Sequence, residues 1–137
     1  MNMNIATLRL EGTDEALKSV SDSLDLEIDS SVKKGGAKRR GGHYSSSALS
    51  ATIVDAENPG NMVVAIREFL AQCKNKNIVF SESSLSAELA IGVTVGEKEQ
   101  FVACVDLFAS DLLAFGELGI ALSVAAYPAS DEDYEIA

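Results

Sequence analysis

The clearest hydrophobic pattern in the chain is a strict alternation in its second half. Apolar residues stand at every second position from Leu85 to Val95, and the positions between them are polar or small. Such alternation is typical of an antiparallel strand with one face on a core and the other in water. Shorter alternating stretches at 4–11 and 120–126 predict two further strands. After a polar turn, the segment 101–107 alternates as well and predicts another strand.

Apolar side chains at helical spacing predict three helices. The first begins after Thr13, a predicted N-cap, and extends to about Asp25. The second covers about 61–74, with its apolar residues three and four positions apart. Ser110 is the predicted cap of the third helix, which Gly119 should end in the left-handed conformation.

These elements, with a further strand at 44–54, follow one another in the order β-α-β-α-β-β-α-β. Hairpins and short helical crossovers of this kind favour an α+β fold. We expect a two-layer sandwich, in part ferredoxin-like, with an antiparallel or mixed sheet and helices packed on one face. The length of 137 residues fits one domain, which we place at 1–130, followed by an acidic tail at 131–137.

Charge is distributed very unevenly along the chain. The stretch 33–40 holds five of the 11 Lys and Arg residues, so the rest of the chain has six basic against 21 acidic side chains, a net charge of −15. A formal net charge of −10 disfavours nucleic acid and an anionic membrane as partners, because both would be repelled by most of the surface. A basic partner protein is favoured instead.

The basic stretch is also rich in glycine, which predicts little intrinsic order. It could bind an anion through backbone N–H groups and positive side chains, although it matches no phosphate-loop motif, or it could be a solvated surface loop. The candidate anion-binding residues are Lys33, Lys34, Lys38, Arg39 and Arg40.

Cysteine and histidine are too few to predict a metal site. Cys73 and Cys104 are expected to be reduced and buried, and with a single histidine and no CxxC spacing we expect neither a metal nor another cofactor. No stretch is apolar for the roughly 20 residues that a membrane-spanning helix needs. The N-terminus lacks the basic and apolar regions of a signal peptide, which predicts a cytoplasmic protein.

No group of residues forms a recognisable catalytic motif. His43 is followed by Tyr44 and three serines, but a hydrolase would also need an oriented base and an oxyanion hole, and GxSxG is absent. Asp106 and Asp111, or Glu88, could form an acid–base pair; a structural role on the wet sheet face or in the first helical turn is the alternative. We therefore expect no enzymatic activity.

The segment VDLFASDLLAFGELGIALSVAAYPAS resembles the C-terminal signature of the uncharacterised, mostly bacterial domain-of-unknown-function 4279 family. Members end with a strand, a Leu-rich short helix, a Gly and a strand that finishes in Tyr; the start, with a strand, a helix and a Lys34-Gly35 pair, is similar too. Members usually carry a Trp after the basic turn, whereas this chain has none and offers Tyr44 or Ala48 there. The resemblance implies no established activity, but families of this type often serve as immunity proteins beside secreted toxins.

The sequence hypothesis is therefore a bacterial immunity protein that binds a basic toxin and occludes its active surface. Carboxylates would mimic phosphate and steer association. The candidate partner-binding residues are Glu88, Asp131, Glu132, Asp133 and Glu135. The alternative is a regulatory domain that binds a small molecule or an anion through the Gly-rich loop at 33–42.

Overall fold

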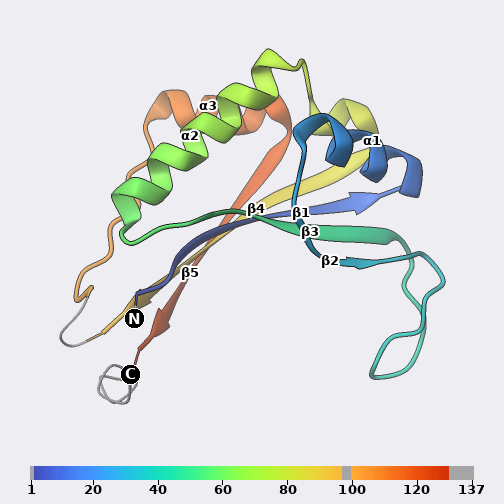
Figure 1. Cartoon of the computed structure of the whole chain (residues 1–137), viewed down its shortest axis with the longest axis horizontal. Helices are drawn as coiled ribbons and strands as arrows, with labels where there is room; N and C mark the ends of the chain where they lie inside the picture. Colours follow the sequence, from blue (N-terminus) through green and yellow to red (C-terminus); the bar gives the residue numbers. More distant parts are fainter. Residues whose placement is uncertain (1, 97–99, 130–137) are drawn as a thin grey trace.

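The computed structural model describes residues 2–96 and 100–129 and shows a mixed sheet of five strands with three α-helices on one of its faces (Figure 1). This arrangement confirms the α+β class and the packing of helices on a single face. In these ranges no helix is both long enough and apolar enough to cross a membrane.

The elements follow one another without long breaks. The strands are β1 (Asn4–Gly12), β2 (Ile28–Val32), β3 (Ser47–Asp55), β4 (Leu85–Val95) and β5 (Ile120–Pro128). The helices are α1 (Asp14–Leu24), α2 (Pro59–Asn75) and α3 (Ala109–Leu118), and a short 3-10 helix, η1 (Phe80–Ser83), precedes β4.

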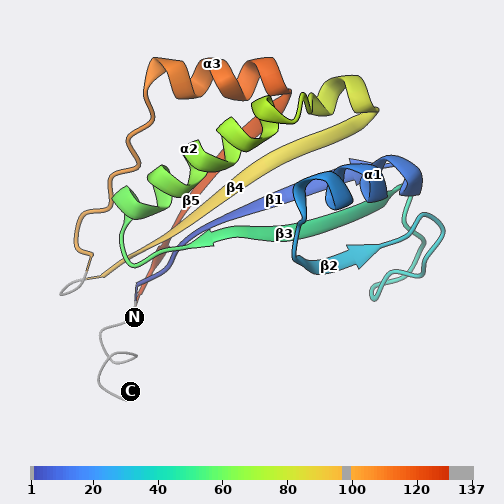
Figure 2. The same cartoon turned by 45° about the horizontal axis from the view of Figure 1, so that its top comes forward.

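The first strand lies in the middle of the sheet. The spatial order is β2-β3-β1-β4-β5, in which β1 pairs antiparallel with both β3 and β4, and β2 pairs antiparallel with β3. The edge strand β5 instead runs parallel to β4, because the α3 crossover brings the chain back before the strand begins. Figure 2 shows all three helices on the same side of the sheet.

The core lies between the sheet and the helices. Ala6, Leu8 and Leu10 of β1 are almost completely buried, as are the alternate residues Leu89 and Ile91 of β4. The intervening side chains of both strands point to the face that no helix covers. The alternation in the sequence therefore predicts correctly which side chains form the core.

The predicted strand at 101–107 is not a strand. The segment is extended, with Ala103, Val105 and Leu107 packed against the core, but it forms no ladder with the sheet. The physical reason is that β4 already has β1 on one side and β5 on the other, so no position beside it is free. Alternation reports which side chains face inward, and it cannot tell whether the backbone is paired.

Two further expectations need correction, and one is confirmed. The hydrophobic pattern does not predict β2, since all but one of its residues are exposed, and the observed order is β-α-β-β-α-β-α-β. The expectation of a partly ferredoxin-like fold is confirmed, because β1 to β4 with α1 and α2 follow the order β-α-β-β-α-β and lie in the order β2-β3-β1-β4. Each of these two helices joins two parallel strands that have an antiparallel strand between them, and β5 is added beside β4. Phe108, instead of Ser110, occupies the N-cap position of α3.

Two predicted helix ends are confirmed. The Thr13 side chain accepts a hydrogen bond from the Ala16 N–H at 3.2 Å, as an N-cap does. Gly119 ends α3 with φ of 75°, in the left-handed region. A Cβ at this glycine would lie within 2.9 Å of the backbone nitrogen of Ser81 in η1, so a side chain is excluded by its neighbours as well as by the backbone angle.

We predict opposite effects for alanine at the two glycines of this helix region. Gly119→Ala should lower the free energy of unfolding by about 2 kcal/mol, because it adds left-handed strain and a clash. Gly116→Ala, inside α3 with no atom within 4 Å of its new Cβ, should raise it by about 0.5–1 kcal/mol. Urea denaturation measures both, and equal effects of the two variants would contradict this account of the α3–β5 turn.

Candidate binding face

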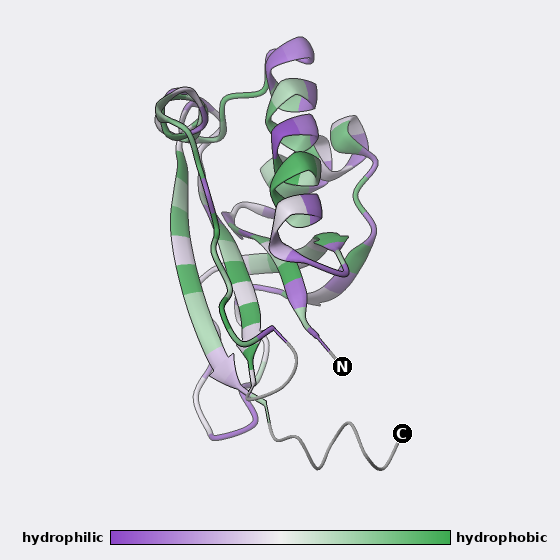
Figure 3. Ribbon diagram, turned by 90° about the vertical axis from the view of Figure 1, so that its left-hand side faces the viewer, coloured by the Kyte–Doolittle hydropathy of each residue, from purple (hydrophilic) through white to green (hydrophobic). Residues whose placement is uncertain are grey.

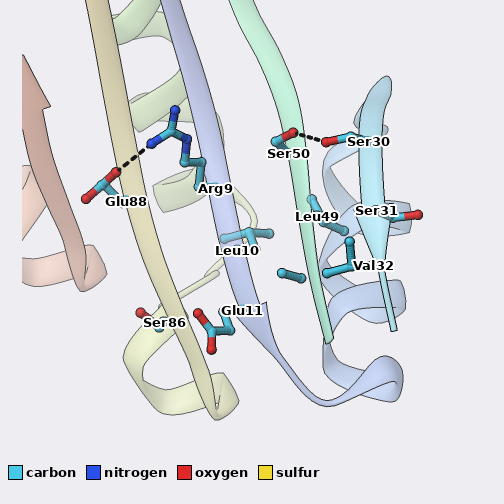
Figure 4. Close-up of a pocket in the computed structure, with 11 residues that line it drawn as sticks. Arg9, Leu10, Glu11, Ser30, Ser31, Val32, Leu49, Ser50, Ser86 and Glu88 are labelled. Atoms are coloured by element: carbon cyan, nitrogen blue, oxygen red, sulfur yellow. Dashed lines mark hydrogen bonds and ion pairs between the residues drawn. The ribbon is translucent and has the colours of Figure 1, made fainter. Parts of the chain in front are cut away.

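The face of the sheet without helices carries a groove of about 420 Å³ across four strands. Its floor is β1 and β3, and β2 and β4 form its sides (Figure 4). The polar residues that line it are Arg9, Glu11, Ser30, Ser31, Ser50, Ser86 and Glu88. Every one of these strands contributes to the groove, so it exists only after the sheet has formed.

One ion pair joins β1, on the floor of the groove, to β4 at its side. Arg9 and Glu88 are direct cross-strand partners, and Arg9 Nη1 is 3.5 Å from Glu88 Oε1. Their side chains are 64% and 41% exposed, so water screens the pair and its contribution to stability is small. The two side chains therefore remain accessible to a ligand.

Three further polar residues of the groove, Ser30, Ser50 and Glu11, have hydrogen-bond partners. The hydroxyl oxygens of Ser30 and Ser50 are 2.6 Å apart and join β2 to β3. The Ser46 hydroxyl donates to the carboxylate of Glu11. With Glu88 paired to Arg9, both carboxylates of the groove already have a donor within the protein.

A second, more apolar groove of about 280 Å³ adjoins the first one at Arg9. Its walls include Met3, Ile5 and Tyr127, and the space between them is open because Gly92 has no side chain. A Cβ at Gly92 would lie 3.4 Å from the Tyr127 ring and 3.3 Å from the Met3 side chain. The uncovered face is thus polar near β2 and β3 and apolar near β5.

The basic loop forms a hydrogen-bonded hairpin, which we call the basic hairpin (residues 33–44). Its two arms are paired where Gly35 N–H donates to Tyr44 O and Tyr44 N–H donates to Gly36 O, both at 2.9 Å. The glycine content predicted little order, but Gly41 and Gly42 have positive φ and serve the tight turn at the tip. Figures 1 and 2 show the basic hairpin projecting beyond the sheet, away from the helices.

All five candidate anion-binding side chains lie on the basic hairpin and are exposed. Lys38 Nζ lies 5.5 Å from the centre of the Tyr44 ring. The ion pairs of the described residues involve Arg9, Arg67 and Lys74, and none of the basic residues of the hairpin. The hairpin therefore presents its positive charge to the solvent.

His43 and the neighbouring serines have structural contacts. His43 Nδ1 is 3.0 Å from the carbonyl oxygen of Gly35, which can only accept, so this nitrogen carries the proton. Ser46 donates to Glu11, and Ser47 accepts a hydrogen bond from the Lys34 N–H at 2.9 Å. These contacts support the hairpin and favour the structural interpretation of this cluster.

The carboxylate of Asp111 joins two helices. Arg67 of α2 approaches it with Nε 3.1 Å from each carboxylate oxygen, and the Phe108 N–H donates to Oδ2 at 2.8 Å. The hydrogen bonds from Arg67 hold the pKa of Asp111 below its ordinary value near 3.8, against the opposing effect of burial. Asp106 takes part only through its backbone carbonyl, which accepts from Arg67. The acid–base interpretation of these two residues is therefore not favoured.

We predict that Asp111→Asn destabilises the protein at neutral pH by about 1–2 kcal/mol, because it removes a charged hydrogen-bond acceptor from a partly exposed arginine. Since the folded pKa is lowered, the stabilisation is complete above the unfolded value of about 3.9 and disappears as the pH falls through the folded pKa. Urea denaturation of wild type and variant from pH 7 to pH 3 should show the difference shrinking. Asp106→Asn is the control; a difference that is constant with pH would contradict the role of Asp111.

Only one of the two cysteines is buried as predicted. Both are free thiols, and burial raises the pKa of the Cys73 thiol to about 12. Cys104 is exposed, because the inward positions of the extended segment are 103, 105 and 107. Within 2–96 and 100–129, no three His, Cys, Asp or Glu side chains gather closely enough to hold a metal ion.

Of the predicted partner-binding residues, Glu88 lies on the uncovered face, as its alternation predicts. Asp131, Glu132, Asp133 and Glu135 lie outside the described residues. The sequence interpretation missed Arg9, Glu11 and the serines of β2, β3 and β4 as neighbours of Glu88. Alternation could have placed them on the wet face, but their proximity depends on the order of strands.

Comparisons with protein-family models, with curated proteins and with solved structures found no match to this chain. The resemblance to the uncharacterised family stays a prediction from sequence.

Proposed function

We propose that this protein is a non-enzymatic binding protein that uses the uncovered face of its sheet to hold a partner protein. The observation that carries the proposal is the face itself: a polar and an apolar groove adjoin at Arg9 and together extend from β2 to β5. Both grooves are shallow and open, whereas sites for small molecules usually enclose most of their ligand. A combined polar and apolar surface of this breadth suits a protein.

The specific form of the proposal is an immunity protein that occludes the active surface of a cognate, basic toxin. Its support is the formal net charge of −10, the accessible Glu88 and the family resemblance of the sequence. Acidic side chains favour association with a basic partner chiefly by raising the rate of encounter. Among the described residues, Cys73 and Asp111 have shifted pKa values, which burial of the thiol and the hydrogen bonds from Arg67 explain. Both residues lie on helices and not on the uncovered face.

We predict that the product of the neighbouring gene is toxic, and that this protein binds it with sub-micromolar affinity and protects the cell when co-expressed. Glu88→Lys should weaken binding at least tenfold, about 1.4 kcal/mol, because it reverses the charge in the groove. Calorimetry measures the affinity.

The matched control is Glu68→Lys, which makes the same charge change at an exposed position of α2. It should alter affinity less than about twofold, since it lies away from the uncovered face. If the neighbouring product is neither bound nor toxic, the immunity proposal is wrong. If both charge reversals weaken binding equally, the partner does not use the uncovered face.

A second candidate function is the binding of an anion or phosphorylated small molecule by the basic hairpin. The observation that favours it is the ordered turn at 38–42, in which Lys38 N–H donates to Gly42 O at 2.9 Å, with exposed arginines at its tip. An ordered turn loses less conformational entropy on binding than an unordered loop.

We predict for this function that wild type binds pyrophosphate or ATP, and that the variant Lys33→Ala, Lys34→Ala, Arg39→Ala, Arg40→Ala does not. The affinity should also fall with added salt, since the contacts are charged and exposed. Lys18→Ala with Lys74→Ala serves as control for a general loss of positive charge. Unchanged binding by the hairpin variant would exclude the hairpin as the site.

A further inference from the structure

The two edges of the sheet differ in how they are protected. The edge strand β2 has five residues, an irregular register between Ile28 and Ser30, and a charged residue, Asp29. A short, irregular, charged strand is a usual protection against pairing with another chain. The Asp29 carboxylate is moreover held by the N–H and the hydroxyl of Thr52, both at 2.6 Å.

The opposite edge strand, β5, has none of these protections. It is nine residues long, its register with β4 is regular throughout, and it contains no Asp, Glu, Lys or Arg. In the described part of the chain β5 pairs only with β4, so the backbone groups along its outer side have no strand partner. Figure 3 shows β5 at the edge of the sheet, without strongly hydrophilic colour along most of its length.

Exposed apolar side chains continue from this edge onto the neighbouring helix. Val124, on the helix side of β5, is half exposed, and so are Phe108, Leu112 and Leu113 at the start of α3. Tyr127 is half exposed on the opposite, uncovered face of β5. The helix α3 packs on β5, so the strand and the helix belong to one side of the molecule. Such grouping of exposed apolar residues is typical of an interaction site.

The distribution of charge favours a second copy of this chain as the partner for this side. Between Phe108 and Pro128 the only charged residues are Asp111, which is paired with Arg67, and Glu117, which is 3.8 Å from Lys74. This side is therefore close to neutral in a chain with a formal net charge of −10. Two copies can meet here without the repulsion that the rest of the surface would impose, and a basic partner finds no unpaired carboxylate.

We infer that β5 is the dimerisation edge of this protein and pairs antiparallel with β5 of a second copy. Antiparallel pairing of a strand with itself has two-fold symmetry, so each copy offers the same groups and the assembly closes at two chains. The product is one continuous sheet through both subunits, with the apolar side chains near β5 and α3 brought together. The inference rests on the edge strand, which also contributes Ser123 and Tyr127 to the apolar groove of the uncovered face. Its test measures self-association alone, so its failure would leave the proposed function of that face standing.

The test measures the mass of the full chain by analytical ultracentrifugation from micromolar to submillimolar concentration. Wild type should change from 14.5 kDa towards twice that mass as concentration rises. The variant Ala121→Lys, Ser123→Lys should dimerise at least tenfold more weakly, because lysines on an edge strand repel across a symmetric pair. Both positions are exposed.

The control variant is Ser30→Lys, Ser86→Lys, which adds the same charge at exposed positions away from β5 and should dimerise like wild type. Amide hydrogen exchange of wild type gives a readout that needs no variant: protection at 120–128 should rise with concentration, and protection at 28–32 should not. Each of three results would overturn the inference: a wild type that stays at 14.5 kDa, a dimer without added protection of β5, or a folded Ala121→Lys, Ser123→Lys variant that dimerises like wild type.

Discussion

The register of β1 against β4 is the constraint on which the rest of the structure depends. Leu8 faces Leu89 across the two strands, both fully buried, and one position further along Arg9 faces Glu88 on the opposite side of the sheet. A slip of one residue would exchange the two faces. It would expose the leucines, at about 1.5–3 kcal/mol each, and bury charged groups, at several kcal/mol each. The interaction that builds the core therefore also builds the binding face.

The helices cover only one face of the sheet because of the side chains that these strands carry on the other. The side chains that point away from the helices include an arginine, two glutamates and several serines, which cannot be buried without partners. Helices consequently pack where the alternate positions are Ala, Leu, Ile and Val. The open side is left to water and, in the function proposed above, to a partner protein.

The ion pair between Arg67 of α2 and Asp111 of α3 helps to position the β5 edge of the sheet. It joins α3 to α2. Arg67 also donates a hydrogen bond to the Asp106 carbonyl, and its guanidinium carbon lies 4.2 Å from the centre of the Phe108 ring. These contacts fix the end of the extended segment where α3 begins. The position of α3 in turn decides where β5 enters the sheet, so one partly buried ion pair helps to place the strand that we assign to dimerisation.

The sequence by itself determined the α+β class, four of the five strands with their inward and outward faces, and the three helices, since side-chain alternation and helical spacing are local properties. It also identified Thr13 and Gly119 as helix ends, because capping depends on neighbours in the chain. The tertiary structure alone decided that 101–107 is unpaired, that β2 pairs with β3, and that Arg9, Glu88 and the serines share one groove. Strand order arises from competition among segments for the two sides of each strand, and no local pattern records which segment succeeds.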